Sequence, residues 1–124
     1  MKKRFLWGCL AAFVLVAYSG FAQEDVKKVD DSGFRHRTRS AVPFNHDEHN
    51  AKAGIKDCGT CHHVYERGRK VQGESSEDKQ CSECHLGKRK DSTDLTKAYH
   101  GLCKGCHRKE KKGPITCGKC HPRR

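Results

Sequence analysis

Apolar residues are unevenly distributed along this chain of 124 residues. One continuous apolar run extends from Phe5 to about Tyr18. Beyond it, apolar positions are scattered, and glycines interrupt every window longer than about ten residues. This pattern predicts short helices at Asn45–Ala53, around Thr93–Cys106 and at the cysteine-containing motifs, with the polar segment Val64–Gln80 as a surface loop.

The long apolar run has the form of an export signal. Three basic residues precede it, and the small residues Gly20 and Ala22 follow it, which predicts cleavage after Ala22. The run is shorter than the ~20 residues that span a bilayer comfortably, so an uncleaved anchor is the lesser alternative. We therefore expect residues 1–22 to be a signal peptide and residues 23–124 to form one periplasmic domain.

Four pairs of cysteines share one spacing and one following residue. Two residues separate the cysteines of each pair, and a histidine comes directly after the second cysteine. The two thiols of such a motif can add to the two vinyl groups of one porphyrin, and the histidine can then bind the iron. The motifs, numbered 1 to 4 with their haems, are Cys58-Gly-Thr-Cys61-His62, Cys81-Ser-Glu-Cys84-His85, Cys103-Lys-Gly-Cys106-His107 and Cys117-Gly-Lys-Cys120-His121.

Paired cysteines also occur in other kinds of site. They build four-cysteine zinc sites and disulfide frameworks, but neither explains why a histidine follows all four pairs. No βαβ pattern supports thioredoxin-like redox chemistry. The ninth cysteine, Cys9, lies in the export signal, so every cysteine of the mature chain belongs to a motif. The sequence therefore predicts four covalent haems.

The mature chain has few large apolar residues from which to form a hydrophobic core. Charged residues make up 33% of the whole sequence, and by itself this composition would suggest disorder. Four porphyrins would supply the apolar surface that a chain of this size lacks. We predict that the chain is unfolded without haem.

Each haem iron has a second axial position, and histidine is the main candidate to fill it. The sequence contains one methionine, Met1, which is lost with the signal. Nine histidines less the four of the motifs leave five, of which one, His36, lies in a basic run and is expected to be solvated. The other four match the number of haems: His46, His49, His63 and His100.

The positions of these histidines restrict which iron each can reach. His46 and His49 are three residues apart on a predicted helix, so they share a face and can each reach a different haem. Adjacent helical side chains diverge by about 100°, so His63 cannot bind the same iron as His62. His100 precedes motif 3 by three residues.

The string from Val42 to His49, followed by Cys58-Gly-Thr-Cys61-His62-His63, resembles the start of cytochrome c3, the class III tetrahaem cytochromes of sulfate-reducing bacteria. The resemblance extends to about Cys120. It implies a multihaem fold, mostly coil with short α-helices, wrapped around four haems. It also implies a small two-stranded sheet, formed by Asp25–Phe44.

The resemblance further implies how the axial ligands pair. It assigns His46 and His62 to haem 1, His63 and His85 to haem 2, His49 and His107 to haem 3, and His100 and His121 to haem 4. Phe44 matches a family aromatic residue beside haem 1, although an ordinary core phenylalanine is an equal alternative. All four motifs have two residues between the cysteines, where many members have four in motifs 2 and 4. The C-terminal part is similar to the trihaem relatives as well.

Charge bears on the kind of partner. The mature chain has 23 basic and 15 acidic residues, a net charge of +8, once the three basic residues of the signal are removed. Haem propionates would reduce this to roughly +4 when oxidised and near zero when reduced. Net charge therefore does not favour nucleic acid. A basic patch around motifs 3 and 4 could dock an acidic redox partner, or be an ordinary solvated tail; its residues are Lys104, Arg108, Lys109, Lys111, Lys112 and Lys119.

Two histidine ligands on every iron would leave no position open to a substrate, which favours an electron carrier over an enzyme. Histidine in place of methionine also favours low potentials. The resemblance implies a shuttle from periplasmic hydrogenase to membrane-bound redox complexes in anaerobic sulfate respiration. The alternatives are a subunit or dedicated donor of such a complex, a donor to metal ions, a multihaem reductase with one open haem, and a zinc-binding structural module.

Overall fold

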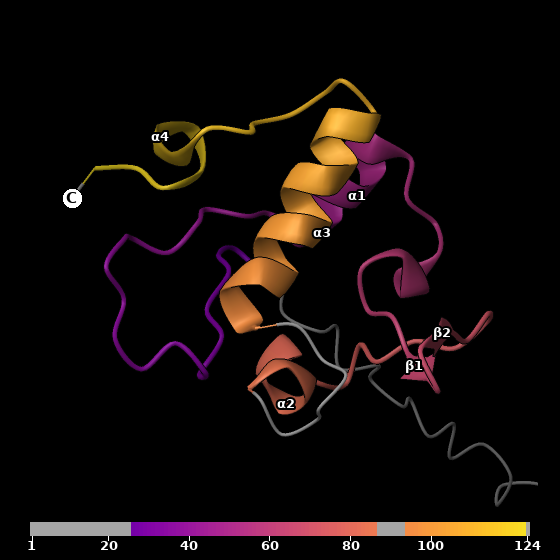
Figure 1. The fold of residues 1–124 in the computed structure, drawn as a ribbon. Coiled ribbons are helices and arrows are strands. Elements are labelled where there is room, and N and C mark those ends of the chain that lie inside the picture. Colours follow the sequence, from indigo (N-terminus) through magenta and orange to yellow (C-terminus); the bar gives the residue numbers. More distant parts are fainter. Residues whose placement is uncertain (1–25, 87–93, 124) are drawn as a thin grey trace, which may run out of the picture.

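The computed structural model describes residues 26–86 and 94–123. Short elements separated by loops make up this part of the chain (Figure 1). Helix α3 runs through the middle of the molecule, with α2 at its N-terminal end and α4 beyond its C-terminal end. The elements are α1 (His46–Ala53), the 3-10 helix η1 (Cys58–Thr60), β1 (Tyr65–Glu66), β2 (Arg69–Lys70), α2 (Cys81–His85), α3 (Leu95–Lys109) and α4 (Cys117–Cys120).

The predicted export signal at residues 1–22 lies outside the described residues. Within the described ranges, none of the helices has both the length and the apolar character needed to cross a membrane.

Both longer helices form close to where the sequence predicts them. Asn45 caps α1, because its backbone is extended and its side chain accepts a hydrogen bond from the Glu48 amide at 3.3 Å. Asp94 caps α3 in the same way, accepting from the Lys97 amide at 3.2 Å. Helix α3 ends at Lys109, three residues beyond the predicted end, since basic side chains in its last turn interact favourably with the helix dipole.

The two-stranded sheet exists, but its predicted position was wrong. Residues 26–44 form one isolated antiparallel bridge, between Lys28 and Pro43, rather than strands. Proline has no amide hydrogen to donate, which limits the pairing there. The sheet lies instead within the predicted surface loop, where β1 and β2 pair antiparallel around the turn Arg67-Gly68. The φ values of 49° and 76° in this turn match the two-residue turns that join hairpin strands.

Few side chains are buried in the part of the chain that the structure describes. Leu95, at 3% exposure, is the buried apolar residue there. Two buried polar residues accompany it, Asp31 at 3% and Ser82 at 4% exposure. Leu95 begins α3 where α3 contacts α2, and Phe34 packs nearby on Tyr99 with ring centroids 5.6 Å apart. The polypeptide therefore has only a small core of its own.

Candidate functional site

The structure brings histidine rings together in four pairs. Each pair joins one histidine of a motif to one histidine from elsewhere in the chain, and these are the pairs that the resemblance implies. The ring centroids are separated by 6.4 Å for His46 and His62, 6.0 Å for His63 and His85, 6.1 Å for His49 and His107, and 6.4 Å for His100 and His121.

This separation is the one that two imidazoles on opposite sides of a metal ion would have. A metal–imidazole bond is about 2 Å long and the bonding nitrogen lies about 1.1 Å from its ring centroid, so the two centroids are about 6.2 Å apart. The observed values of 6.0 to 6.4 Å agree with it. The rings of each pair therefore fit on the two faces of a haem.

Short elements carry the paired rings. Helix α1 presents His46 and His49 to different partners, and helix α3 does the same with His100 and His107, which are two turns apart. The adjacent His62 and His63 also face different partners, His46 and His85 respectively. Each of these three elements thus contributes to two of the pairs.

Hydrogen bonds fix the orientation of several rings. The Nδ1 atom of His107 lies 2.6 Å from the Pro114 carbonyl oxygen, and that of His121 lies 2.8 Å from the Ser40 carbonyl oxygen. Such contacts hold a ring in the tautomer whose other nitrogen is free for a metal. Burial, together with the charges of His85 and Lys70, lowers the pKa of His63, so its ring is neutral, the form that binds metals.

His49 differs from the other rings in its surroundings. Among the described residues, its Nδ1 is the buried side-chain nitrogen or oxygen atom without a hydrogen-bond partner. Buried polar atoms in proteins are rarely left without one. Phe44 covers this ring at a centroid distance of 4.9 Å and also lies 6.1 Å from His46. The His49 ring thus has an unpaired nitrogen, faces His107 and is covered by Phe44, which fits a site built around a haem.

Gly113 allows the loop after α3 to approach His107. Its φ is 83°, which L side chains rarely adopt, and a Cβ there would lie 2.8 Å from the His107 ring. Only glycine therefore lets the backbone pass close enough for the Pro114 carbonyl to accept the hydrogen bond of His107.

The two cysteines of motifs 2, 3 and 4 lie on one turn of a helix, whereas in motif 1 Cys61 directly follows the 3-10 helix η1. In α2 and α4 the two thiols are three residues apart, and motif 3 lies wholly within α3. Burial raises the pKa of the Cys61 and Cys81 thiols. No three cysteine, histidine or acidic side chains converge as a metal-ion site in the described ranges, so the zinc alternative gains no support there.

Comparison with known proteins shows the family. The model of the class III cytochrome c family matches residues 22–121, nearly the whole chain. This chain belongs to the class III cytochrome c family. Its members are multihaem cytochromes that carry electrons, and they bind covalent c-type haems. The predicted family and the predicted multihaem fold of short helices with a small sheet are therefore confirmed.

Two relatives found by sequence agree with this assignment. The chain is 33% identical over 93 residues to cytochrome c3 from Desulfovibrio desulfuricans, a match that covers 69% of this chain and 82% of that protein. It is 40% identical over 74 residues to the high-molecular-weight cytochrome c of Nitratidesulfovibrio vulgaris, covering 53% of this chain and 13% of that protein. The solved structure of PpcB, a cytochrome c7 from Geobacter sulfurreducens, matches with 29% identity, coverage of 71% and 92%, and a TM-score of 0.37.

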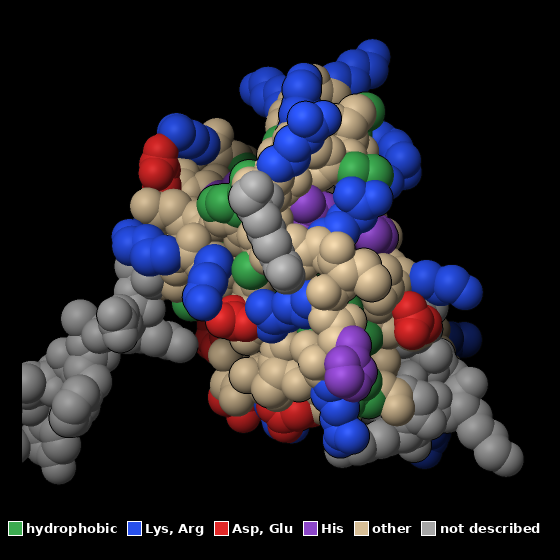
Figure 2. All heavy atoms as spheres, turned by 90° about the vertical axis from the view of Figure 1, so that its left-hand side faces the viewer, with side chains coloured by type: hydrophobic (Ala, Val, Ile, Leu, Met, Phe, Trp, Pro, Cys, Tyr) green, Lys and Arg blue, Asp and Glu red, His purple; other side chains and the backbone are tan. Residues whose placement is uncertain are grey.

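The predicted basic patch of this class III cytochrome lies where α3 ends. Most of its side chains are exposed, and Figure 2 shows Lys and Arg side chains gathered at the top of the molecule, above the acidic ones. Arg39 and Arg123 add positive charge beside His121, where they line a cavity of about 240 Å³ with Thr38, Ser40 and Pro122. Positive charge therefore lies near the His100–His121 pair.

Sequence reasoning missed two features of the site. The role of Gly113 depends on a contact with His107, which the local sequence does not reveal. Asp31 was also missed: its turn with Gly33 has a local Asx-turn signal, but its other partners, Ser82 and Tyr99, are 51 and 68 residues away in the chain.

Proposed function

We propose that this class III cytochrome is a periplasmic electron carrier with four covalent haems, each bound by two histidines. The observation that carries the proposal is the set of four histidine pairs with ring centroids 6.0 to 6.4 Å apart. The eight motif cysteines would hold the porphyrins as thioethers. The histidines would then determine what the irons can do.

The histidine pairs favour electron transfer over catalysis. Each haem, when bound, supplies an iron that is oxidised and reduced by one electron. Because two rings of this chain lie on opposite sides of each site, both axial positions would be filled and no substrate could bind. Histidine at both axial positions also favours low reduction potentials, because a methionine ligand would raise the potential and the described residues include no methionine. A multihaem reductase would need one of these rings to point elsewhere.

Shared elements would link the haems in a definite order. The adjacent residues His62 and His63 would join haems 1 and 2, helix α1 would join haems 1 and 3, and helix α3 would join haems 3 and 4. The order along the molecule would be 2–1–3–4. Neighbouring haems held by the same short element would be close enough to exchange electrons rapidly.

Haem stoichiometry and spin state test this proposal. The holoprotein should contain four haems per chain by mass and by pyridine haemochrome absorbance. All irons should be low-spin, and carbon monoxide should leave the spectrum of the native reduced protein unchanged. Three haems per chain would contradict the predicted number, and a high-spin signal with carbon monoxide binding would favour the reductase.

The basic patch supports an acidic redox partner, such as a hydrogenase or a membrane-bound complex. Lys111, Lys112 and Lys119 are exposed around the end of α3 and in α4. Replacing all three by glutamine should slow electron uptake from an acidic partner several-fold at low ionic strength, because charge steering raises association rates. Salt should reduce the difference.

A matched control tests whether the position of the charge matters. Replacing the exposed Lys56, Arg67 and Arg69 by glutamine removes the same charge away from the patch. This variant should retain most of the wild-type rate. Equal slowing of both variants, or no slowing of either at low salt, would contradict a docking role for the patch.

The match to part of a larger cytochrome supports a second candidate role. The chain aligns with 13% of the high-molecular-weight cytochrome c. A carrier of this kind could serve as a subunit or dedicated donor of a larger redox complex. Gentle extraction of native membranes followed by size analysis separates the two roles, since a free shuttle would elute as a small single-chain protein and a subunit would elute with its complex.

A further inference from the structure

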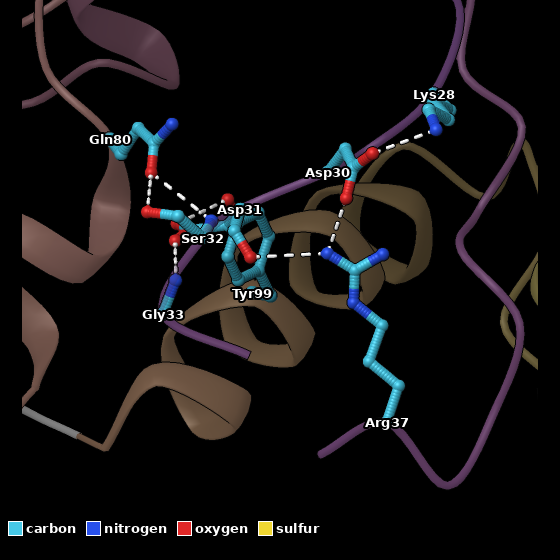
Figure 3. Close-up of polar contacts among 8 residues, drawn as sticks. All are labelled: Lys28, Asp30, Asp31, Ser32, Gly33, Arg37, Gln80 and Tyr99. Atoms are coloured by element: carbon cyan, nitrogen blue, oxygen red, sulfur yellow. Dashed lines mark hydrogen bonds and ion pairs between the residues drawn. The ribbon is translucent and has the colours of Figure 1, made fainter. Parts of the chain in front are cut away.

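A buried carboxylate lies between three segments of the chain (Figure 3). Asp31 is only 3% exposed. Its Oδ1 accepts a hydrogen bond from the Gly33 amide at 2.8 Å, and its Oδ2 accepts from the Ser82 amide at 3.1 Å and the Tyr99 hydroxyl at 2.9 Å. The carboxylate thus joins the N-terminal segment to both α2 and α3.

These partners place Asp31 at motif 2. Ser82 is 4% exposed and lies between Cys81 and Cys84, the cysteines that would hold haem 2. The Tyr99 hydroxyl also lies near the Cys81 sulfur. The Asp31 carboxylate therefore accepts a hydrogen bond from the peptide group that directly follows Cys81, one of the two residues that would attach haem 2.

The carboxylate is buried in its charged form. Burial alone would raise the pKa of Asp31, but hydrogen bonds from Ser82, Gly33 and Tyr99 outweigh it and hold the pKa below its usual value. These donors are neutral groups. Arg37 forms its ion pair with the neighbouring Asp30 and reaches only the backbone carbonyl oxygen of Asp31, at 3.1 Å. The negative charge of Asp31 thus has no side-chain counter-ion among these contacts.

The surrounding backbone fixes the position of this charge. A Cβ at Gly33 would lie 2.4 Å from the Ser82 Cβ and 2.9 Å from the Leu95 Cδ2, so the turn after Asp31 is pressed against α2 and α3. Ser32 is held as well, because its hydroxyl donates to the Gln80 side-chain oxygen at 2.6 Å and its amide does so at 3.1 Å. The carboxylate has little freedom to move away from motif 2.

We propose that Asp31 tunes the reduction potential of haem 2, lowering it relative to the other haems through a fixed, buried negative charge. The inference rests on the proposed function, because it requires a haem at Cys81 and Cys84. When the redox partner gives one electron to this iron, the iron changes from ferric to ferrous and loses one unit of positive charge. A nearby anion attracts the ferric iron more strongly, and in a partly dry interior this difference is larger than at the surface. Haem 2 therefore accepts its electron at a lower potential than it would without the Asp31 charge.

Individual haem potentials of the holoprotein test this role. In Asp31→Asn, which keeps the shape of the side chain, the potential of haem 2 should shift in the positive direction by more than that of any other haem. Asp30→Asn is the matched control, since Asp30 is exposed and paired with Lys28 and Arg37, and it should shift haem 2 much less. Equal shifts in the two variants, or an unchanged haem 2 in Asp31→Asn, would overturn the proposal.

Tyr99→Phe separates the effect of the Asp31 charge from the effect of the hydrogen bond that holds Asp31 in place. It also provides a second test if the Asp31→Asn protein does not accumulate. It removes a hydrogen bond but keeps the carboxylate, whose charge is then less offset by a donor. The potential of haem 2 should therefore stay low or shift further down. A positive shift in Tyr99→Phe would mean that loosening the contact, rather than removing the charge, changes the potential. A wild-type count of three haems with free Cys81 and Cys84 would instead show that the proposed function fails at haem 2.

Discussion

His63 allows a test of ligation at a single haem. Its ring faces His85, while its neighbour His62 faces His46. Replacing His63 by alanine should leave the attachment motif intact and open one axial position. We expect one haem in four to become high-spin and to bind carbon monoxide, as measured by electron paramagnetic resonance and absorbance.

His36→Ala is the matched control for this experiment. His36 is exposed and is not in any of the four pairs. The control should keep the wild-type spectrum. A fully low-spin His63→Ala protein would contradict the role of His63 as a ligand.

Gly113 allows a second test at the scale of one residue. A methyl group at this position meets the His107 ring and requires an unfavourable φ, so Gly113→Ala should lower the stability of the holoprotein by about 1–3 kcal/mol. Gly101→Ala should instead raise the stability of the holoprotein. Gly101 lies inside α3, no atom of the described residues beyond its chain neighbours and its own helix backbone lies within 4 Å of its would-be Cβ, and alanine stabilises a helix interior by about 0.5–1 kcal/mol. Thermal unfolding monitored by circular dichroism distinguishes the two, and equal effects would contradict the close contact at His107.

At the scale of elements, helix α1 connects helix stability to ligation. The helix has eight residues, too few to be stable alone, and it carries both His46 and His49. Asn45→Ala removes the cap and should cost about 1 kcal/mol. Fraying should then increase high-spin signal at two haems, 1 and 3, while Asn45→Asp should restore the wild-type spectrum. An unchanged spectrum in Asn45→Ala, despite lower stability, would mean that the paired rings do not depend on this cap.

The same elements show how much of the fold could be predicted. Capping residues and histidine spacing are local signals, so α1 and most of α3 were predicted to within a few residues. The hairpin also had a local signal, a two-residue turn ending in Gly68, but the polar composition of that segment favoured a loop. The hydrogen bonds of Asp31 to Ser82 and Tyr99 had almost no local sequence signal, because these residues meet Asp31 only after α2 and α3 have packed together.

At the scale of the whole molecule, the polypeptide alone has little to hold it together. Leu95 is the deeply buried apolar side chain of the described residues, and the exposed apolar ones include Val26, Leu86 and Ile115. Fully burying one leucine contributes about 2 kcal/mol, which the conformational entropy of ordering one or two residues already offsets.

Removing the haems should therefore unfold the chain. We expect residues 23–124, produced where haem is not attached, to show a disordered circular dichroism spectrum and no cooperative thermal transition. The haem-loaded protein should unfold cooperatively under the same conditions, because porphyrins between the paired rings would cover exposed apolar side chains. Keeping the thiols reduced in the apoprotein excludes disulfides as the cause of any difference. A cooperative, native-like transition of the apoprotein would show instead that Leu95, the Asp31 network and the helix caps suffice to form the fold.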